Sequence, residues 1–169
     1  MEIENEFIDQ SILRINENTP KIEKCLHQLS DEEVWTKPNT NSNSIGNLIL
    51  HLCGNITQYI ISSLGEKEDL RDRNQEFLVN GSLSKTELIE KLKDVIEEAT
   101  ALLINLNRKK LMRNHAVQGF ELTGIGIIIH VVEHYSYHTG QIAFYTKLLK
   151  NHDLQFYKGR NLNTKNKLK

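Results

Sequence analysis

The segment from Ile125 to Lys150, IGIIIHVVEHYSYHTGQIAFYTKLLK, decides both the fold and the candidate site. It reads as a helix and carries three histidines, His130, His134 and His138, spaced four residues apart. On a helix, residues four apart lie one turn apart on nearly the same face. The histidines are therefore either three unrelated polar residues on an amphipathic helix, or a set that includes two ligands of a metal ion.

Composition limits the classes of protein to which the chain can belong. Its 169 residues fit one domain with a core that needs no structural metal or disulfide. The net charge of −1 provides no basic surface, so we expect no nucleic-acid partner. Cys25 and Cys53 form no disulfide framework, and no secretory signal follows Met1, which favours a reduced, cytoplasmic protein. The most apolar run, Ile125 to Val132, is too short to span a membrane.

Long segments with helical periodicity dominate the chain and predict an all-α fold. Four long helices are expected, over residues 2–29, 44–64, 84–107 and 123–151. No segment shows the sustained alternation of polar and apolar residues that is typical of a β-strand. We therefore predict a four-helix bundle.

The connection between the second and third helices decides the direction in which the helices run. Residues 65–83 form a polar link that is longer than the usual connection between antiparallel neighbours in a bundle. We interpret it as a long crossover that leaves the second and third helices parallel, so that the second and fourth helices run antiparallel. Residues 1–152 are then expected to form a single domain, followed by a polar, basic tail at 153–169.

A line of polar residues crosses the second helix, which is otherwise apolar nearly all round. Asn47, His51 and Asn55 are spaced four apart, and Gln58 continues the line. Buried polar groups need hydrogen-bonding partners. The line therefore faces either a polar face of another helix or a wet pocket.

Helix geometry limits which histidines can share one metal ion. Two nitrogens bound to one ion are at most about 4 Å apart, whereas His130 and His138 are about 12 Å apart along the helix axis. Only a neighbouring pair can bind, either His130 with His134 or His134 with His138. If the second and fourth helices run antiparallel, His51 lies at a height along the bundle axis that is closer to the second pair. The crossover interpretation thus selects His51, His134 and His138, and leaves His130 as a supporting residue one turn away.

Three histidine ligands leave coordination positions open for water or substrate, which is typical of catalytic rather than structural sites. Imidazole suits zinc, nickel, copper or iron, and affinity alone does not choose among them. The His134–His138 pair encloses Tyr135, Ser136 and Tyr137 and lacks the glutamate that follows the first histidine in thermolysin-type proteases. That class of enzyme is therefore disfavoured.

Several segments resemble the signatures of a known superfamily. NSIGNLILHL at Asn43–Leu52 and EHYSYHTGQI at Glu133–Ile142 look like those of the DinB/YfiT-like four-helix proteins. DRNQEF at Asp72–Phe77 looks like a segment of one uncharacterised DinB-like subfamily. The resemblance covers roughly Phe7 to Leu149 and implies a bundle with a long crossover that is often dimeric. The proline-containing segment that usually follows the fourth helix in this subfamily has no counterpart, because residues 154–160 lack a proline.

The resemblance also implies a divalent metal, zinc or nickel, held by three histidines. Carried over residue by residue, these are His51, His134 and His138. The residues that we expect to support the ligands or line a pocket beside them are His130, Asn47, Asn55 and Gln141.

Three functions stay open for such a protein. Some characterised relatives resemble bacillithiol or mycothiol-dependent transferases, which implies transfer of a low-molecular-weight thiol to a small-molecule electrophile by a homodimeric enzyme. Arg71 and Arg73 are the nearest groups that could hold an acidic thiol, although surface salt bridges are the simpler interpretation. The second function is hydrolysis by metal-bound water. Glu133 could assist as a base, although it lies about 100° around the helix from His134, so an exposed or supporting role is the simpler interpretation. The third is a non-catalytic metal-binding or structural bundle.

Overall fold

The chain forms a bundle of long helices in the computed structural model, which describes residues 3–167. The outermost residues of the predicted domain and tail, 1–2 and 168–169, lie outside the described residues. The long helices are α1 (Ile3–Gln28), α3 (Ile45–Ile56) with its π-helical continuation η1 (Thr57–Leu64), α5 (Lys85–Ile104) and α7 (Gly124–Lys150). The short helices are α2 (Asp31–Trp35), α4 (Arg73–Leu78) and α6 (Arg108–Met112).

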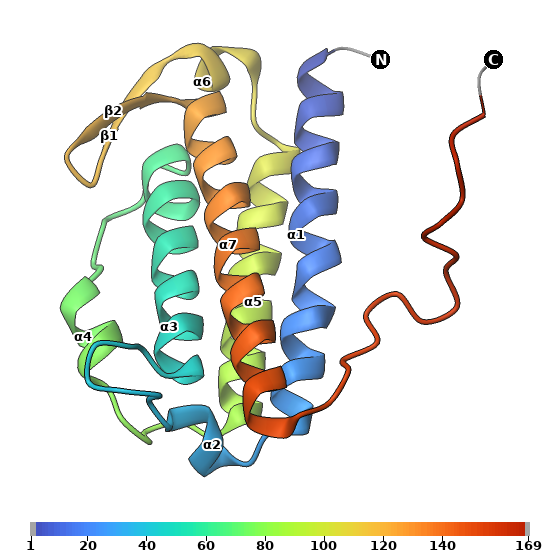
Figure 1. The fold of residues 1–169 in the computed structure, drawn as a ribbon. Helices are drawn as coiled ribbons and strands as arrows, with labels where there is room; N and C mark the ends of the chain where they lie inside the picture. The colour runs from blue at the N-terminus through green and yellow to red at the C-terminus, as the bar shows by residue number, and fades with distance from the viewer. Residues whose placement is uncertain (1–2, 168–169) are drawn as a thin grey trace.

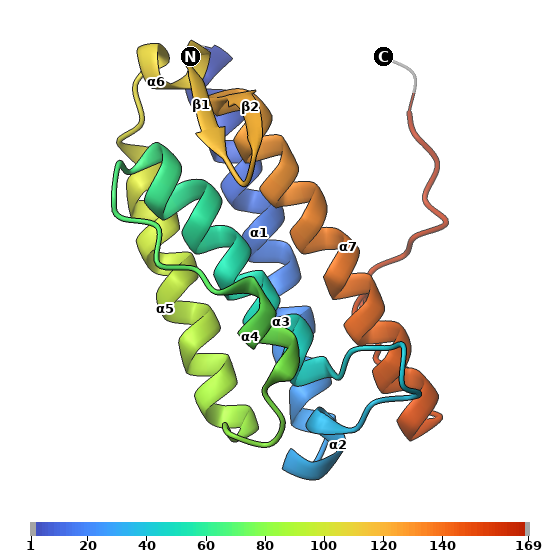
Figure 2. The same cartoon turned by 90° about the vertical axis from the view of Figure 1, so that its left-hand side faces the viewer.

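The directions of the long helices confirm the predicted crossover. Figure 1 shows α3 and α5 running the same way, and α1 and α7 running the opposite way. The link between η1 and α5 returns along the outside of the bundle and carries α4, which packs on α3 (Figure 2). The architecture is therefore the all-α four-helix bundle with a long crossover that the sequence predicts, and α3 and α7 are antiparallel.

Side-chain caps set where the helices begin. Ser30, Ser44 and Ser84 each form a capping box, at the starts of α2, α3 and α5 respectively. Thr123 caps α7 in the same position, and Asn151, in the left-handed conformation, ends that helix. The two helices that carry the histidines, α3 and α7, thus both start at a residue that the sequence marks as a cap.

A short β-hairpin, which the sequence analysis does not predict, precedes α7. Its strands β1 (Asn114–Val117) and β2 (Phe120–Thr123) pair antiparallel. Both turn residues, Gln118 and Gly119, have positive φ values, 51° and 81°, as a two-residue type I′ turn requires. Gln118 accepts a hydrogen bond from the hydroxyl of Tyr59 on η1 at 2.8 Å. The turn is therefore tied to the end of the helix that carries His51.

Among residues 151–167 of the C-terminal segment, those near its start contact the bundle. Leu154 is buried and Phe156 packs partly against the core, whereas residues 157–167 are exposed. Within residues 3–167, none of the helices has the length and apolar character needed to cross a membrane.

Candidate metal centre

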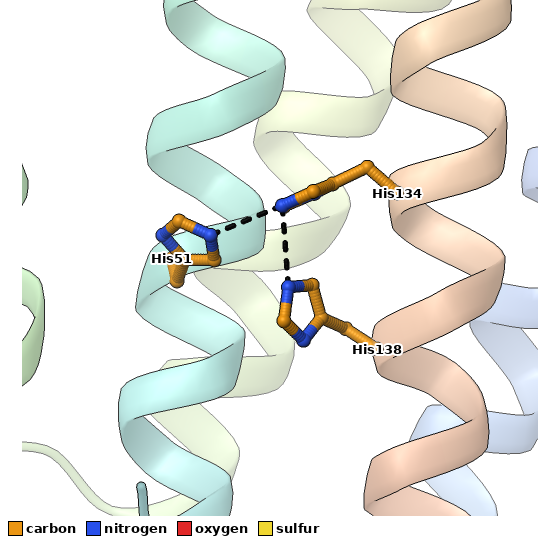
Figure 3. A group of neighbouring side chains, drawn as sticks. All are labelled: His51, His134 and His138. Carbon is orange, nitrogen blue, oxygen red and sulfur yellow. Dashed lines mark hydrogen bonds between the residues drawn. The ribbon is translucent and has the colours of Figure 1, made fainter.

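Three histidines from two antiparallel helices meet at one point between α3 and α7 (Figure 3). Nε2 of His134 lies 3.1 Å from Nε2 of His51 and 3.2 Å from Nε2 of His138. One ring nitrogen from each of the three residues lies within 4.8 Å of the other two. His51 and His138 are buried and His134 is half-buried, so the cluster is largely shielded from water.

The spacing of the nitrogens is compatible with one shared metal ion. At Zn–N distances of about 2.0–2.1 Å, a tetrahedral ion holds its ligand nitrogens roughly 3.3 Å apart. Nε2 of His134 can carry at most one proton, yet it faces two other ring nitrogens that both act as acceptors when their Nδ1 atoms are protonated. A divalent cation would accept all three lone pairs at once. The three histidines could therefore hold a metal ion.

Acceptors on neighbouring residues orient two of the three imidazoles. Nδ1 of His51 donates to Oε2 of Glu76 at 2.8 Å, and Nδ1 of His138 donates to Oε1 of Gln141 at 2.7 Å. A hydrogen bond from Nδ1 fixes the tautomer that keeps a lone pair on Nε2. Both rings consequently present Nε2 as a ligand atom.

A buried arginine holds Glu76 in turn. Nε of Arg71 donates to Oε1 of Glu76 at 2.6 Å and Nη2 donates to Oε2 at 2.9 Å, which makes a bidentate ion pair. The Arg71 side chain is only 3% exposed, and its Nη1 donates to Gln58 at 2.8 Å. Gly54 leaves room for this pair, because a Cβ atom there would lie 1.9 Å from Oε1 of Glu76. Glu76 thus orients His51, and Arg71 balances the charge of Glu76.

Asn47 fastens α4, the helix that carries Glu76, to the start of α3. Its Nδ2 donates to the backbone carbonyls of Glu76 at 2.9 Å and Val79 at 2.8 Å. Its Oδ1 accepts from the hydroxyl of Ser44, the N-cap of α3. These contacts place Asn47 in support of the α4 backbone rather than against the histidine rings.

Aromatic rings flank the cluster on two sides. The ring of Phe77 on α4 lies 4.9 Å from that of His51, centroid to centroid, and Tyr137 lies 5.0 Å from His138. The hydroxyl of Tyr137 accepts from Nε2 of Gln141 at 3.1 Å. Gln141 thus contacts both His138 and the exposed Tyr137, so one residue links the cluster to the surface.

Burial favours the neutral forms of His134 and His138, whereas hydrogen bonds keep Glu76 ionised. Burial, reinforced by the neighbouring His138 and His51 rings, lowers the pKa of His134 to about 3. Burial also lowers the pKa of His138 below its usual value. For Glu76, burial alone would raise the pKa, but hydrogen bonds from His51 and Arg71 outweigh it and hold the pKa below its usual range. At neutral pH the site therefore combines free imidazole lone pairs with an intact ion pair.

His130 lies one turn from His134 and outside the cluster. Its Nε2 accepts a hydrogen bond from Nδ2 of Asn55 at 3.3 Å, and its ring stacks on that of Tyr59, with centroids 4.3 Å apart. Oδ1 of Asn55 and Nδ1 of His134 are both buried, and neither has a hydrogen-bond partner within the described part of the chain. A second polar layer, Asn55 and His130, thus lies beside the three histidines.

The ion pair that supports His51 was not predicted from the sequence. Glu76 was given no role there, and the interpretation of Arg71 as a surface salt-bridge residue is wrong, because its side chain is buried. The available signal was the DRNQEF segment at Asp72–Phe77, which the family resemblance marked without giving a role. Arg73 stays exposed, with its guanidinium over the ring of Phe77.

Solved structures of several bacterial proteins share this fold. A conserved protein from Enterococcus faecalis has a TM-score of 0.75 and 15% sequence identity, covering 90% of this chain and 99% of that chain. A DinB-like protein from Bacillus subtilis has a TM-score of 0.67 and 20% identity, covering 90% and 99%. A DinB-like protein from Bacillus cereus has a TM-score of 0.61 and 18% identity, covering 80% and 87%. At these identities the similarity establishes the fold alone.

The predicted resemblance to DinB-like proteins is confirmed by these structures. No curated protein matches the sequence. The family described as a protein of unknown function, DUF1572, matches residues 2–158. Since the match extends over nearly the whole chain, the protein belongs to the DUF1572 family.

Proposed function

We propose that the protein is a divalent-metal-dependent enzyme that transfers a low-molecular-weight thiol to an electrophile. The observation that carries this proposal is the convergence of Nε2 atoms from His51, His134 and His138 at one shielded point. All three ligands are neutral imidazoles, and the charges of Glu76 and Arg71 cancel. A bound divalent ion would therefore keep its full charge, act as a Lewis acid and lower the pKa of a thiol.

The residues of the chain have separate parts in this proposal. The three histidines hold the ion, Glu76 keeps His51 in the ligating tautomer, and the rings of Phe77 and Tyr137 reduce the access of water from two sides. In the reaction the thiol would lose its proton to bulk water, its sulfur would form a bond to an electrophilic carbon, and the leaving group would depart from that carbon with its bonding electrons. A neutral ligand set suits this chemistry because it does not repel an anionic sulfur.

Hydrolysis is the second candidate, since the same open coordination positions could serve water. A hydrolase of this kind needs a base near the ion, and Glu76 has no free carboxylate oxygen for that role. Glu76 accepts three hydrogen bonds from His51 and Arg71, so its oxygens are already engaged. Glu133, for which an exposed role was the simpler interpretation, is exposed on α7. Thiol transfer depends less on such a base, because a free thiol is already a much stronger acid than water, and this favours thiol transfer over hydrolysis.

Imidazole ligands suit zinc or nickel, and we propose one of these as the metal. We further propose that the protein is a cytoplasmic homodimer. Large apolar side chains on the outer face of α7 would provide a contact surface for a second copy. These exposed side chains are Ile129, Tyr137, Phe144 and Leu148. Sedimentation of the full chain measures the oligomeric state, and a monomer at micromolar concentration would contradict this part.

Metal content and a reaction screen test the proposal. Elemental analysis compares the wild type with His134→Ala and with His152→Ala, a control at an exposed histidine beyond α7. We expect one equivalent of metal in the wild type and the control, and a loss in His134→Ala. The metal-loaded protein is then assayed for consumption of monobromobimane above the uncatalysed rate, with several low-molecular-weight thiols.

Each outcome separates the candidate functions. Metal-dependent and thiol-dependent consumption of the electrophile supports the transferase. Thiol-independent cleavage of an ester, amide or phosphate panel favours the hydrolase instead. Stoichiometric metal with neither activity favours a non-catalytic bundle, and a wild type that binds no metal overturns the proposal.

A further inference from the structure

The three histidines differ in the hydrogen-bond partners of their Nδ1 atoms. His51 donates its Nδ1 proton to Glu76, and His138 donates its own to Gln141. Nδ1 of His134 is buried and has no hydrogen-bond partner within residues 3–167. A histidine that binds an ion through Nε2 carries its proton on Nδ1 and almost always donates it to an acceptor. Two members of the set thus have this acceptor, and the central member, His134, requires one.

Asn55 offers an unused acceptor close to the cluster. It lies one helical turn from His51 on α3, and only 3% of the residue is exposed. Its Nδ2 donates to Nε2 of His130, which lies one turn from His134 on α7. That bond sets the orientation of the amide and leaves Oδ1 buried without a donor among the described residues. A buried carbonyl oxygen in this state is uncommon and calls for a partner.

We propose that Oδ1 of Asn55 accepts the Nδ1 proton of His134 when a metal ion is bound, either directly or through one water. This inference rests on the proposed metal site and deepens it. Asn55 is then a positioning residue, and the set of outer acceptors becomes Glu76, Gln141 and Asn55, one for each ligand. The Asn55 amide then both donates and accepts a hydrogen bond, because Nδ2 donates to His130 while Oδ1 accepts from His134.

The alternative is that Asn55 only supports the packing of His130. Three substitutions separate the two roles. Asn55→Leu removes the acceptor at similar volume, and Asn55→Asp keeps an acceptor oxygen at the same place. His130→Phe removes the partner of Nδ2 but keeps a ring to stack on Tyr59. Asn55→Ala serves as a second acceptor-free variant if the leucine is not accommodated.

Zinc affinity and imidazole protons are the two readouts, both independent of activity. Competition with a chromophoric chelator at neutral pH gives the zinc Kd of each full-length variant. We expect Asn55→Leu to weaken binding roughly 10- to 100-fold, and Asn55→Asp and His130→Phe to stay near the wild type. In the zinc-loaded wild type, proton–nitrogen spectra of the histidine side chains should show slowly exchanging Nδ1 protons on all three ligands. The signal of His134 should be lost in Asn55→Leu, while those of His51 and His138 remain.

The outcomes distinguish this inference from the proposed function. If the wild type binds zinc and Asn55→Leu binds it equally well with the His134 proton still protected, Asn55 is not the acceptor. Equal losses in Asn55→Leu, Asn55→Asp and His130→Phe would show a packing role and overturn the inference as well. A wild type that binds no zinc overturns the proposed function and this inference together.

Discussion

Glu76→Gln tests whether a buried ion pair holds His51 in place. The substitution keeps an amide oxygen that can accept from Nδ1 of His51, but it removes the charge opposite Arg71. The two side chains are 3% and 9% exposed, so the guanidinium would be left buried without its counter-ion. Removing one partner of a buried pair costs about 3–5 kcal/mol. For a domain of this size, that cost corresponds to a fall in Tm of roughly 6–20 °C.

A surface ion pair provides the matched control for this prediction. Glu66 accepts from Arg113 at 2.9 Å and from Lys110 at 3.2 Å, but its side chain is 53% exposed. Exposed pairs contribute little to stability, so Glu66→Gln should lower Tm far less than Glu76→Gln. The double variant Arg71→Met, Glu76→Gln leaves no unpaired charge, and we expect it to recover part of the stability lost in Glu76→Gln.

Circular dichroism melting in the presence of a chelator measures these changes without a contribution from metal. A separate zinc titration should show affinity lowered about tenfold in Glu76→Gln, because a neutral amide orients His51 less strongly than a carboxylate. Equal falls in Tm for Glu76→Gln and Glu66→Gln would refute the reasoning. A double variant as unstable as the sum of its single variants would refute it too.

Three further predictions concern metal, pH and one glycine. At free zinc of 100 times the Kd, bound zinc stabilises the fold by about 2.7 kcal/mol, so a chelator should lower the wild-type Tm in scanning fluorimetry; an equal response in His134→Ala would contradict the site. In metal-free protein, burial lowers the pKa of His134 from its ordinary value of 6.5 to about 3. Between these two pH values, His134 takes up a proton in the unfolded chain but not in the folded one. The stability that this difference provides above pH 6.5 is lost progressively as the pH falls towards 3. The Tm should therefore fall more steeply with pH in the wild type than in His134→Ala, as melting curves recorded across this range would show. Gly54→Ala would place Cβ 1.9 Å from Oε1 of Glu76 and 2.9 Å from Nε of Arg71, which we expect to cost about 1–3 kcal/mol in urea unfolding. Gly140→Ala, where a Cβ meets no atom within 4 Å, should instead be neutral or stabilise helix α7 by up to about 1 kcal/mol.

The parts of the fold that the sequence predicts are those in which many residues repeat one pattern. The long helices follow from apolar spacing, and the caps Ser44 and Thr123 mark where α3 and α7 begin. The length of the link after η1 indicates a crossover, and the crossover makes α3 antiparallel to α7. That direction brings His51 to the level of His134 and His138. One inference about chain direction therefore decided which histidines were expected to meet.

The parts that the sequence did not predict depend on a few residues or on tertiary contacts. The hairpin turn uses Gln118 and Gly119 in place of the more familiar Asn-Gly, and its strands have four residues each. Helix α4 has six residues, so it shows no useful periodicity. Within its charged surroundings Glu76 looks like a solvated surface residue. It is buried because Asn47 binds the backbone of α4 and Gly54 leaves space for the ion pair.

The three histidines differ in what holds them, and this difference has a consequence for the site. His134 and His138 lie one turn apart on a single long helix, so their relative position depends on the local geometry of α7. His51 lies on another helix, and its ring depends on Glu76, which the crossover carries. Substitutions in the crossover should therefore affect metal binding by altering the orientation of His51, and should leave His134 and His138 in place. A crossover variant such as Glu76→Gln should then leave the Nδ1 proton of His138 protected by Gln141 while exchange at His51 accelerates.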